Sequence, residues 1–83
     1  MKLTVRYFAS TREVIGHAIE TVDTSAETVA ALRDELIARG GAYGQGLARG
    51  KAVRVSLDQV MSDESATLSD RCEVAFFPPV TGG

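Results

Sequence analysis

The sequence predicts an α+β domain, in which a mixed β-sheet carries one main helix on one of its faces. Three observations predict this class. Apolar and polar side chains alternate over residues 2–8, the stretch 73–77 is an apolar run typical of a strand, and apolar side chains recur at helical spacing over residues 25–39. A chain of 83 residues, 45% of them hydrophobic, suits one small folded domain.

The first part of the chain predicts a hairpin of two strands. Residues 2–8 form the first strand, residues 9–16 a short irregular or helical connection that ends at a glycine, and residues 17–24 the antiparallel partner strand. In the partner strand Ile19 and Val22 cannot share one face without a bulge, because neighbouring side chains of a strand point to opposite faces.

The main helix is predicted at Ser25–Arg39. Thr24 and Glu27 have the spacing of a capping box, with Thr24 as the N-cap. The pair Gly40-Gly41 supplies the stop, since glycine readily adopts the left-handed conformation that ends helices. The apolar stripe of this helix is expected to face the core.

The second half of the chain predicts two loops and three short strands. The expected order is a glycine-rich loop at 41–50, a strand at 52–57, a turn at 58–59, a return strand at 60–61, a polar loop at 62–71 and a last strand at 73–77. Val53 and Val55 are expected to point inward and Leu68 to fill the core. A helical crossover places the last strand parallel to the first. This is a β-grasp arrangement, assigned to residues 1–77, with 78–83 as an extended tail.

Composition and charge argue against several classes of function. The net charge of −2 lacks the basic surplus typical of nucleic-acid binding. No window of 18 residues is uncharged and apolar, which argues against a membrane span, and the N-terminal residues lack the apolar centre of a signal peptide. The one cysteine, Cys72, has no partner for an internal disulfide. Together these features predict a cytoplasmic protein.

No group of side chains in the sequence predicts a catalytic, cofactor or metal site within this chain. Residues 46–52 resemble a P-loop, but the spacer between the glycines is one residue short and Ala52 stands where Ser or Thr should bind magnesium. Cys72, beside Arg71, is interpreted as a structural or half-exposed thiol. His17, the one histidine, is interpreted as a solvated side chain and not as a metal ligand.

The last six residues predict a stiff and slim tail. Pro78 and Pro79 end the strand and stiffen the base of the tail. The four residues beyond them span about 13 Å when extended, at roughly 3.3 Å each. Gly82 and Gly83 carry no Cβ, so the terminal carboxylate can enter a narrow pocket. An ionised carboxylate is a poor electrophile. Because the chain lacks a nucleotide site, a partner enzyme is expected to activate the carboxylate with ATP.

The aromatic pair Phe76-Phe77 precedes this tail. Alternation in the last strand requires one of the two rings to point away from the core. An outward phenylalanine is typical of an interface anchor. The alternative is a bulge that packs both rings into the core.

The ending from Val74 to Gly83 resembles that of the molybdopterin synthase small subunits, a family of ubiquitin-like sulfur carriers. The resemblance extends to Tyr7-Phe8-Ala9, to Arg12-Glu13 and to the length of the chain, and the tail is its specific part. It departs in the middle, where the family often has an asparagine after the third strand and this chain has Val55-Ser56-Leu57-Asp58. The family's usual glycine before the last strand is also missing from Ser69–Cys72.

The resemblance implies a carrier whose chemistry takes place on Gly83. An adenylyltransferase related to ubiquitin-activating enzymes would adenylate Gly83 with ATP, and a sulfur donor system would convert it to a thiocarboxylate. Val80, Thr81 and Gly82 would enter a pocket of the synthase large subunit, which holds the catalytic side chains, and sulfur would pass to cyclic pyranopterin monophosphate. The resemblance implies a heterotetramer, whose interface on this chain we expect at four further residues, which are Phe8, Phe77, Pro78 and Pro79.

Three other functions stay open at this point. The same tail chemistry would serve a sulfur carrier for thiamine thiazole or another pathway. A ubiquitin-like modifier would instead be conjugated to lysines through Gly83. A non-covalent binding module would have an inert tail, and deleting Gly82-Gly83 would then leave its function unchanged.

Overall fold

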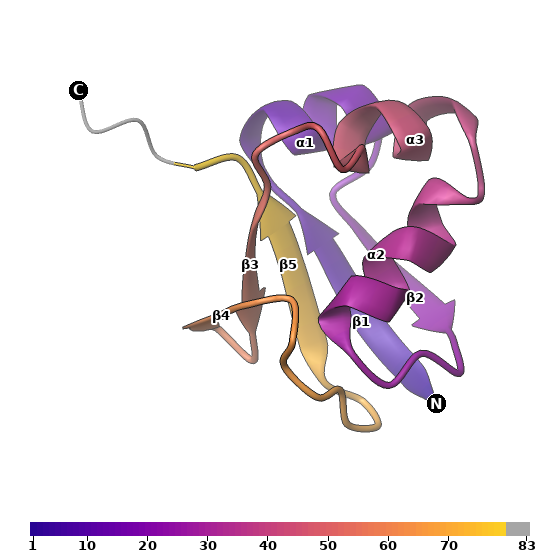
Figure 1. Cartoon of the computed structure of the whole chain (residues 1–83), viewed down its shortest axis with the longest axis vertical. Helices are drawn as coiled ribbons and strands as arrows, with labels where there is room; N and C mark the ends of the chain where they lie inside the picture. Colours follow the sequence, from indigo (N-terminus) through magenta and orange to yellow (C-terminus); the bar gives the residue numbers. More distant parts are fainter. Residues whose placement is uncertain (80–83) are drawn as a thin grey trace.

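The computed structural model describes residues 1–79, and within them a mixed sheet carries helices on one side (Figure 1). Along the chain the elements are β1 (Lys2–Tyr7), α1 (Ala9–Ile15), β2 (Ile19–Asp23), α2 (Val29–Ile37), α3 (Gly41–Leu47), β3 (Arg54–Leu57), β4 (Val60–Ser62) and β5 (Glu73–Phe77).

The first and last strands lie side by side at the centre of the sheet. The strand order is β2-β1-β5-β3-β4. β1 pairs antiparallel with β2 and parallel with β5, with Tyr7 opposite Phe76. β3 pairs antiparallel with both β5 and β4. The predicted hairpin, the parallel pairing and the β-grasp fold are therefore confirmed.

The core lies between the sheet and the helices. Alternate residues of the central strands point to this side, and α2 and α3 cover them; the fully buried set is Leu3, Val5, Tyr7, Val22, Val29, Leu32, Leu36, Leu47, Val74 and Phe76. Leu68 is buried, as predicted. Ile19 and Val22 do not share a face of β2, since Val22 is buried in the core and Ile19 is 50% exposed. We call the opposite side of the sheet, which no helix of residues 1–79 covers, the open face (Figure 1).

Helix α2 begins at Val29, four residues later than predicted. Its N-cap is Thr28, whose hydroxyl accepts the N–H of Ala31 at 3.2 Å. The predicted capping box at Thr24 is wrong, because the Thr24 hydroxyl instead donates to Glu35 at 2.9 Å. The segment before α2 pairs with the polar loop through a bridge between Thr28 and Thr67, which holds it out of the helix.

Helix α3 lies where the sequence predicts a glycine-rich loop, so that prediction is wrong. Glycine disfavours helices intrinsically, but Leu47 is fully buried and holds the segment against the core. A Cβ on Gly46 would lie 3.0 Å from Cγ1 of Ile15 in α1. The glycine therefore permits the close packing of α1 on α3.

Two connections form as the sequence predicts. Residues 9–16 are helical as α1 and end at Gly16, whose φ of 97° is left-handed. The turn between β3 and β4 is Asp58-Gln59, with φ values of 49° and 68°.

Candidate functional site

The predicted tail begins where β5 ends, at Phe77. Pro78 and Pro79 follow and are half-buried. They leave the sheet at the end where β1 also stops, because β1 and β5 run parallel (Figure 1). The predicted tail residues Val80, Thr81, Gly82 and Gly83 lie outside the described residues.

The two rings of Phe76 and Phe77 point to opposite sides of the sheet. Phe76 is 1% exposed and stacks on Tyr7 in the core, with ring centroids 6.3 Å apart. Phe77 is half-buried and belongs to the open face, since neighbouring strand residues alternate. The prediction that one ring faces away from the core is confirmed. The alternative, a bulge that packs both rings into the core, is wrong.

Phe8 stands at the same end of the open face. It follows Tyr7 directly, is 45% exposed, and its N–H donates to the carbonyl of Phe76 at 3.1 Å. The register pairs Tyr7 with Phe76, so Phe8 and Phe77 are the next residues on neighbouring parallel strands. The structure therefore brings together four of the predicted site residues, which are Phe8, Phe77, Pro78 and Pro79. We call this group the tail root.

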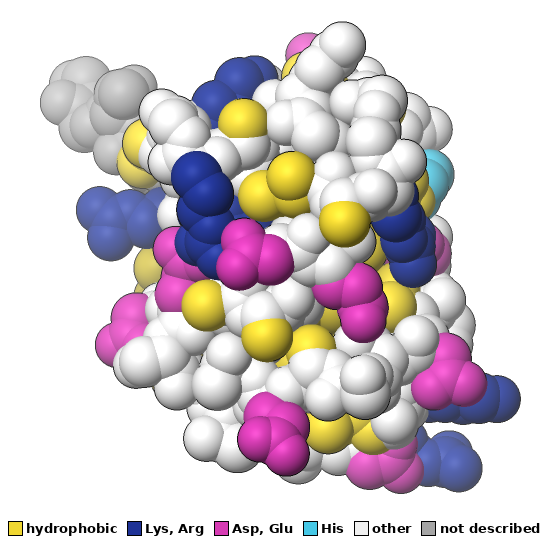
Figure 2. Space-filling view, turned by 45° about the vertical axis from the view of Figure 1, so that its right-hand side comes forward, with side chains coloured by type: hydrophobic (Ala, Val, Ile, Leu, Met, Phe, Trp, Pro, Cys, Tyr) yellow, Lys and Arg dark blue, Asp and Glu magenta, His cyan; other side chains and the backbone are white. Residues whose placement is uncertain are grey.

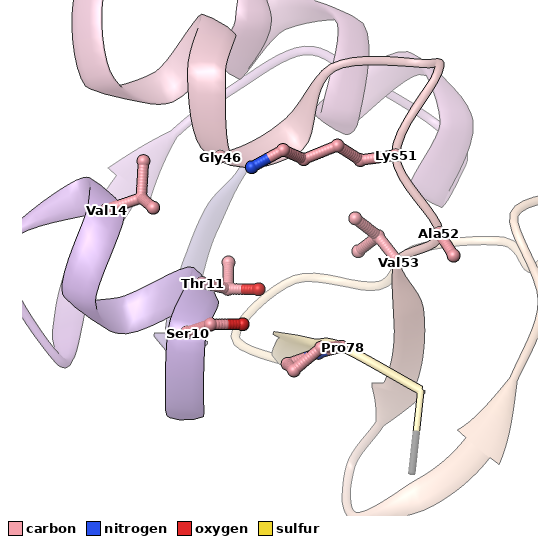
Figure 3. Close-up of a pocket in the computed structure, with 8 residues that line it drawn as sticks. All are labelled: Ser10, Thr11, Val14, Gly46, Lys51, Ala52, Val53 and Pro78. Carbon is pink, nitrogen blue, oxygen red and sulfur yellow. The ribbon is translucent and has the colours of Figure 1, made fainter. Parts of the chain in front are cut away.

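A small hollow opens beside the tail root (Figure 3). Its volume is about 50 Å³, and its lining comprises Ser10, Thr11, Val14, Gly46, Lys51, Ala52, Val53 and Pro78. The Lys51 side chain extends across it toward Gly46, and the hydroxyls of Ser10 and Thr11 are turned to its interior (Figure 3). Pockets for small-molecule ligands measure roughly 300–1,000 Å³, so the hollow is far too small for a nucleotide.

A buried arginine fixes the loop that carries Lys51. Arg33 of α2 is 3% exposed, and its guanidinium donates to the carbonyls of Leu47 at 2.8 Å, Ala48 at 2.7 Å and Lys51 at 3.2 Å. Glu64 pairs with the same guanidinium at 3.2 Å. These partners satisfy a charge that would otherwise be costly to bury. Sequence reasoning missed this role, because an arginine in an amphipathic helix usually lies on its solvated side.

A second polar cluster closes the core beside β2. The carboxylate of Glu20 accepts from the hydroxyls of Tyr7 at 2.8 Å and Tyr43 at 2.7 Å, from Arg39 at 3.0 Å, and contacts Nε2 of His17 at 2.9 Å. His17 is exposed as predicted, but it is also a member of this cluster, which the sequence did not indicate. The partners of Glu20 come from four separate segments, so no local sequence pattern could have predicted the cluster.

The cluster strongly perturbs two ionisable groups. Burial raises the pKa of Glu20, but the hydrogen bonds from His17, Tyr43, Tyr7 and Arg39 outweigh it and lower the pKa to about 2. Burial and the bond to Glu20 raise the pKa of Tyr7 well above its ordinary value. Glu20 is therefore an ionised anchor that joins β2 to α3 and to the end of α2.

The remaining candidate groups are structural. Cys72 is buried, as a structural thiol should be. Within residues 1–79 no cluster of three or more His, Cys, Asp and Glu side chains is arranged to hold a metal ion. The helices of the same described part are all too short or too polar to span a membrane.

Comparison with known proteins places this geometry in a family. The family model described as the ThiS family matches residues 5–83 of the sequence. The chain belongs to the ThiS family. The matched range includes the tail root and continues through the predicted tail, 78–83, to Gly83.

One similar relative of this ThiS family chain is the molybdopterin synthase sulfur carrier subunit of Haemophilus influenzae, which is 40% identical over 82 residues, or 98% of this chain and 99% of that protein. Two solved structures share the fold at 24% identity and cover both chains completely. They are small archaeal modifier protein 1 of Haloferax volcanii, with a TM-score of 0.79, and the complex of subunits 1 and 2 of molybdopterin-converting factor from Helicobacter pylori, with a TM-score of 0.67. These likenesses show a ubiquitin-like β-grasp fold.

Proposed function

We propose that this ThiS family chain is a sulfur carrier and the small subunit of a molybdopterin synthase. The observation that carries the proposal is the 40% identity, over nearly the whole of both chains, to a molybdopterin synthase sulfur carrier subunit. The Gly-Gly ending and the stiff Pro78-Pro79 base suit this role physically, because they make a slim tail with a reach of about 13 Å.

The proposed chemistry proceeds on the carboxyl group of Gly83. A partner adenylyltransferase joins that carboxylate to the AMP part of ATP and releases pyrophosphate. Sulfide from a sulfur donor system displaces AMP, which leaves a thiocarboxylate. The thiocarboxylate then gives its sulfur to cyclic pyranopterin monophosphate, and the carboxylate returns with an oxygen from water. This chain supplies the carrier group, and the large subunit supplies the catalytic side chains.

The proposed partner surface is the tail root with the adjoining open face. Phe8 and Phe77 present apolar rings there, and Val80, Thr81 and Gly82 would enter the partner's pocket. The Helicobacter pylori structure is a complex of two subunits of molybdopterin-converting factor, which supports a large-subunit partner for this chain. We propose a heterotetramer with that subunit, located in the cytoplasm because the lone Cys72 needs no oxidising compartment.

The decisive experiment is mass analysis of the tail peptide from untagged protein that has been expressed in its own host. We expect a fraction of the peptide to carry sulfur in place of one oxygen at the Gly83 carboxyl group. Replacement of oxygen by sulfur is nearly isobaric with oxidation of methionine or cysteine. The mass must therefore be localised by fragmentation to Gly83.

The matched control is a variant with one extra alanine after Gly83, which leaves the domain intact and displaces the reactive group. That variant should carry no sulfur. A wild-type tail that stays unmodified, even with the host's adenylyltransferase, sulfur donor and ATP added, would refute the carrier role. An isopeptide bond from Gly83 to a lysine would indicate a protein modifier instead.

The proposed interface gives a prediction for Phe77. Phe77→Ser should weaken binding of the large subunit about fivefold or more, because loss of a well-packed aromatic anchor typically costs more than about 1 kcal/mol. Isothermal titration calorimetry with the purified large subunit measures the effect. Ala31→Ser, on the exposed side of α2, is the control and should bind normally. Unchanged affinity of the Phe77 variant would exclude the tail root from the interface.

A further inference from the structure

Arg71 has a backbone conformation that an arginine rarely adopts. It lies in the turn before β5, and its φ is 66°, in the left-handed region. There the Cβ of an L-residue crowds the following carbonyl, whereas glycine has no such atom. A side chain at this position is therefore disfavoured relative to glycine, and its presence requires an explanation.

The fold uses the backbone of Arg71 and not its side chain. The N–H of Arg71 donates to the carbonyl of Lys2 at 2.7 Å, and Cys72 beside it is buried. A glycine would make the same backbone bond. The Arg71 side chain is 89% exposed, and its ionic contact with Asp70 is long, at 3.8 Å. An ion pair so exposed contributes little to stability.

The Arg71 side chain borders a shallow hollow at the end of the open face. This hollow has a volume of about 340 Å³ and is lined by Lys2, Leu3, Thr4, Thr21 and Arg71. Phe77 stands six residues farther along the chain, which corresponds to about 20 Å of extended strand. The hollow and the tail root therefore mark the two ends of one continuous surface.

The lining of the hollow includes two basic side chains, those of Lys2 and Arg71. Of the carboxylates around it, Asp70 accepts the backbone N–H of Lys2 at 2.9 Å and lies 3.8 Å from the Arg71 guanidinium. Glu73 pairs with Arg6 at 2.7 Å, and Asp23 with the N-terminal ammonium group at 3.8 Å. Among residues 1–79 the ammonium group of Lys2 has no ion-pair partner. The whole chain is nonetheless acidic, at −2, and Figure 2 shows acidic and basic side chains interspersed on the side that bears the helices.

We propose that Arg71 and Lys2 form a second contact site for the large subunit, which receives an acidic segment of that protein. The proposal rests on the proposed function, since it presumes that this partner covers the open face when it receives the tail. The carboxylates of the segment lie against the guanidinium of Arg71 and the ammonium of Lys2. This contact accounts for an arginine where the backbone favours glycine.

The substitution Arg71→Gly tests the proposal, because it should change the stability of the fold and the affinity for the large subunit in opposite directions. The substitution should raise the midpoint of thermal unfolding by a few degrees, about 4 °C, because it removes backbone strain. It should also weaken binding of the purified large subunit roughly three- to tenfold at low salt, and this loss should shrink at high salt. Arg71→Lys, which keeps the charge, should retain most of the affinity.

The control is Gln59→Gly, at another exposed residue of positive φ, 68°, in the turn between β3 and β4. It should raise the unfolding midpoint similarly and leave the affinity unchanged. The proposal is overturned if Arg71→Gly binds the large subunit as tightly as wild type does, or if the substitution lowers the unfolding midpoint. It is also overturned if the substitution weakens binding of the adenylyltransferase and leaves binding of the large subunit unchanged. Failure of the wild-type chain to bind the large subunit would instead overturn the partner assignment on which both proposals rest.

Discussion

Glu20 shows how one side chain can make the stability of a small domain depend on pH. Its pKa is about 2 in the folded chain against an ordinary value of 4.5. A carboxyl group with a lowered folded pKa stabilises the fold fully above its unfolded pKa, and the contribution disappears as pH falls through the folded pKa. We expect about 2–3 kcal/mol from Glu20 at pH 7, lost progressively between pH 4.5 and pH 2.

Urea unfolding of wild type and Glu20→Gln at several pH values tests this expectation. The variant should be less stable by about 2 kcal/mol at pH 7, and the difference should narrow steadily below about pH 4.5. Glu13→Gln, at an exposed position of α1, serves as the control and should follow wild type. A difference between wild type and Glu20→Gln that stays constant from about pH 7 to pH 3 would contradict the assigned pKa.

At the scale of the elements, the strands were the most predictable part of the fold. β1 buries alternate side chains, so a period of two in the sequence reports its contact with the core. β5 buries Val74, Ala75 and Phe76 in succession, and the apolar run in the sequence reports its place in the middle of the sheet. The predicted bounds of β5, 73–77, agree with the structure. The end of β5 at Phe77 was predictable for a related reason, because the effect of Pro78 and Pro79 on the backbone is local.

The helices were less predictable, because contacts between distant segments decide their bounds. Thr24 has the spacing of a capping residue, yet its hydroxyl is bound by Glu35, eleven residues away. The segment Gly41–Leu47 has poor helix propensity, yet the burial of Leu47 and the contact of Gly46 with Ile15 make it helical. Tertiary packing thus overrides local preference in both places.

The same reasoning explains which site features the sequence did not reveal. The pairing of Glu20 with Tyr43 spans 23 residues, and that of Arg33 with the Lys51 carbonyl spans 18. The left-handed conformation of Arg71 is likewise imposed by its backbone bond to Lys2, across the whole domain. Such features depend on the assembled fold and have no local pattern.

At the scale of the whole molecule, the last strand in the sequence is the middle strand of the sheet. β5 pairs with β1 on one side and β3 on the other, and it buries Val74 and Phe76. Without it the sheet would separate into two unconnected pairs, β2-β1 and β3-β4. The strand that joins the two halves of the sheet and the tail proposed to carry sulfur are therefore adjacent in sequence, and we expect their effects on folding and on function to be separable.

Two truncations test this separation. A chain that ends at Pro79 should fold cooperatively with a free energy of unfolding within about 0.5 kcal/mol of the full chain, because the paired strands lie within residues 1–79. A chain that ends at Cys72 should be unfolded, because it loses both ladders of β5 and the side chains that fill the core between them. Far-ultraviolet circular dichroism with urea titration distinguishes the two. A cooperative transition in the shorter chain would show that the sheet does not need its central strand, and a large loss in the longer one would give the tail a structural role.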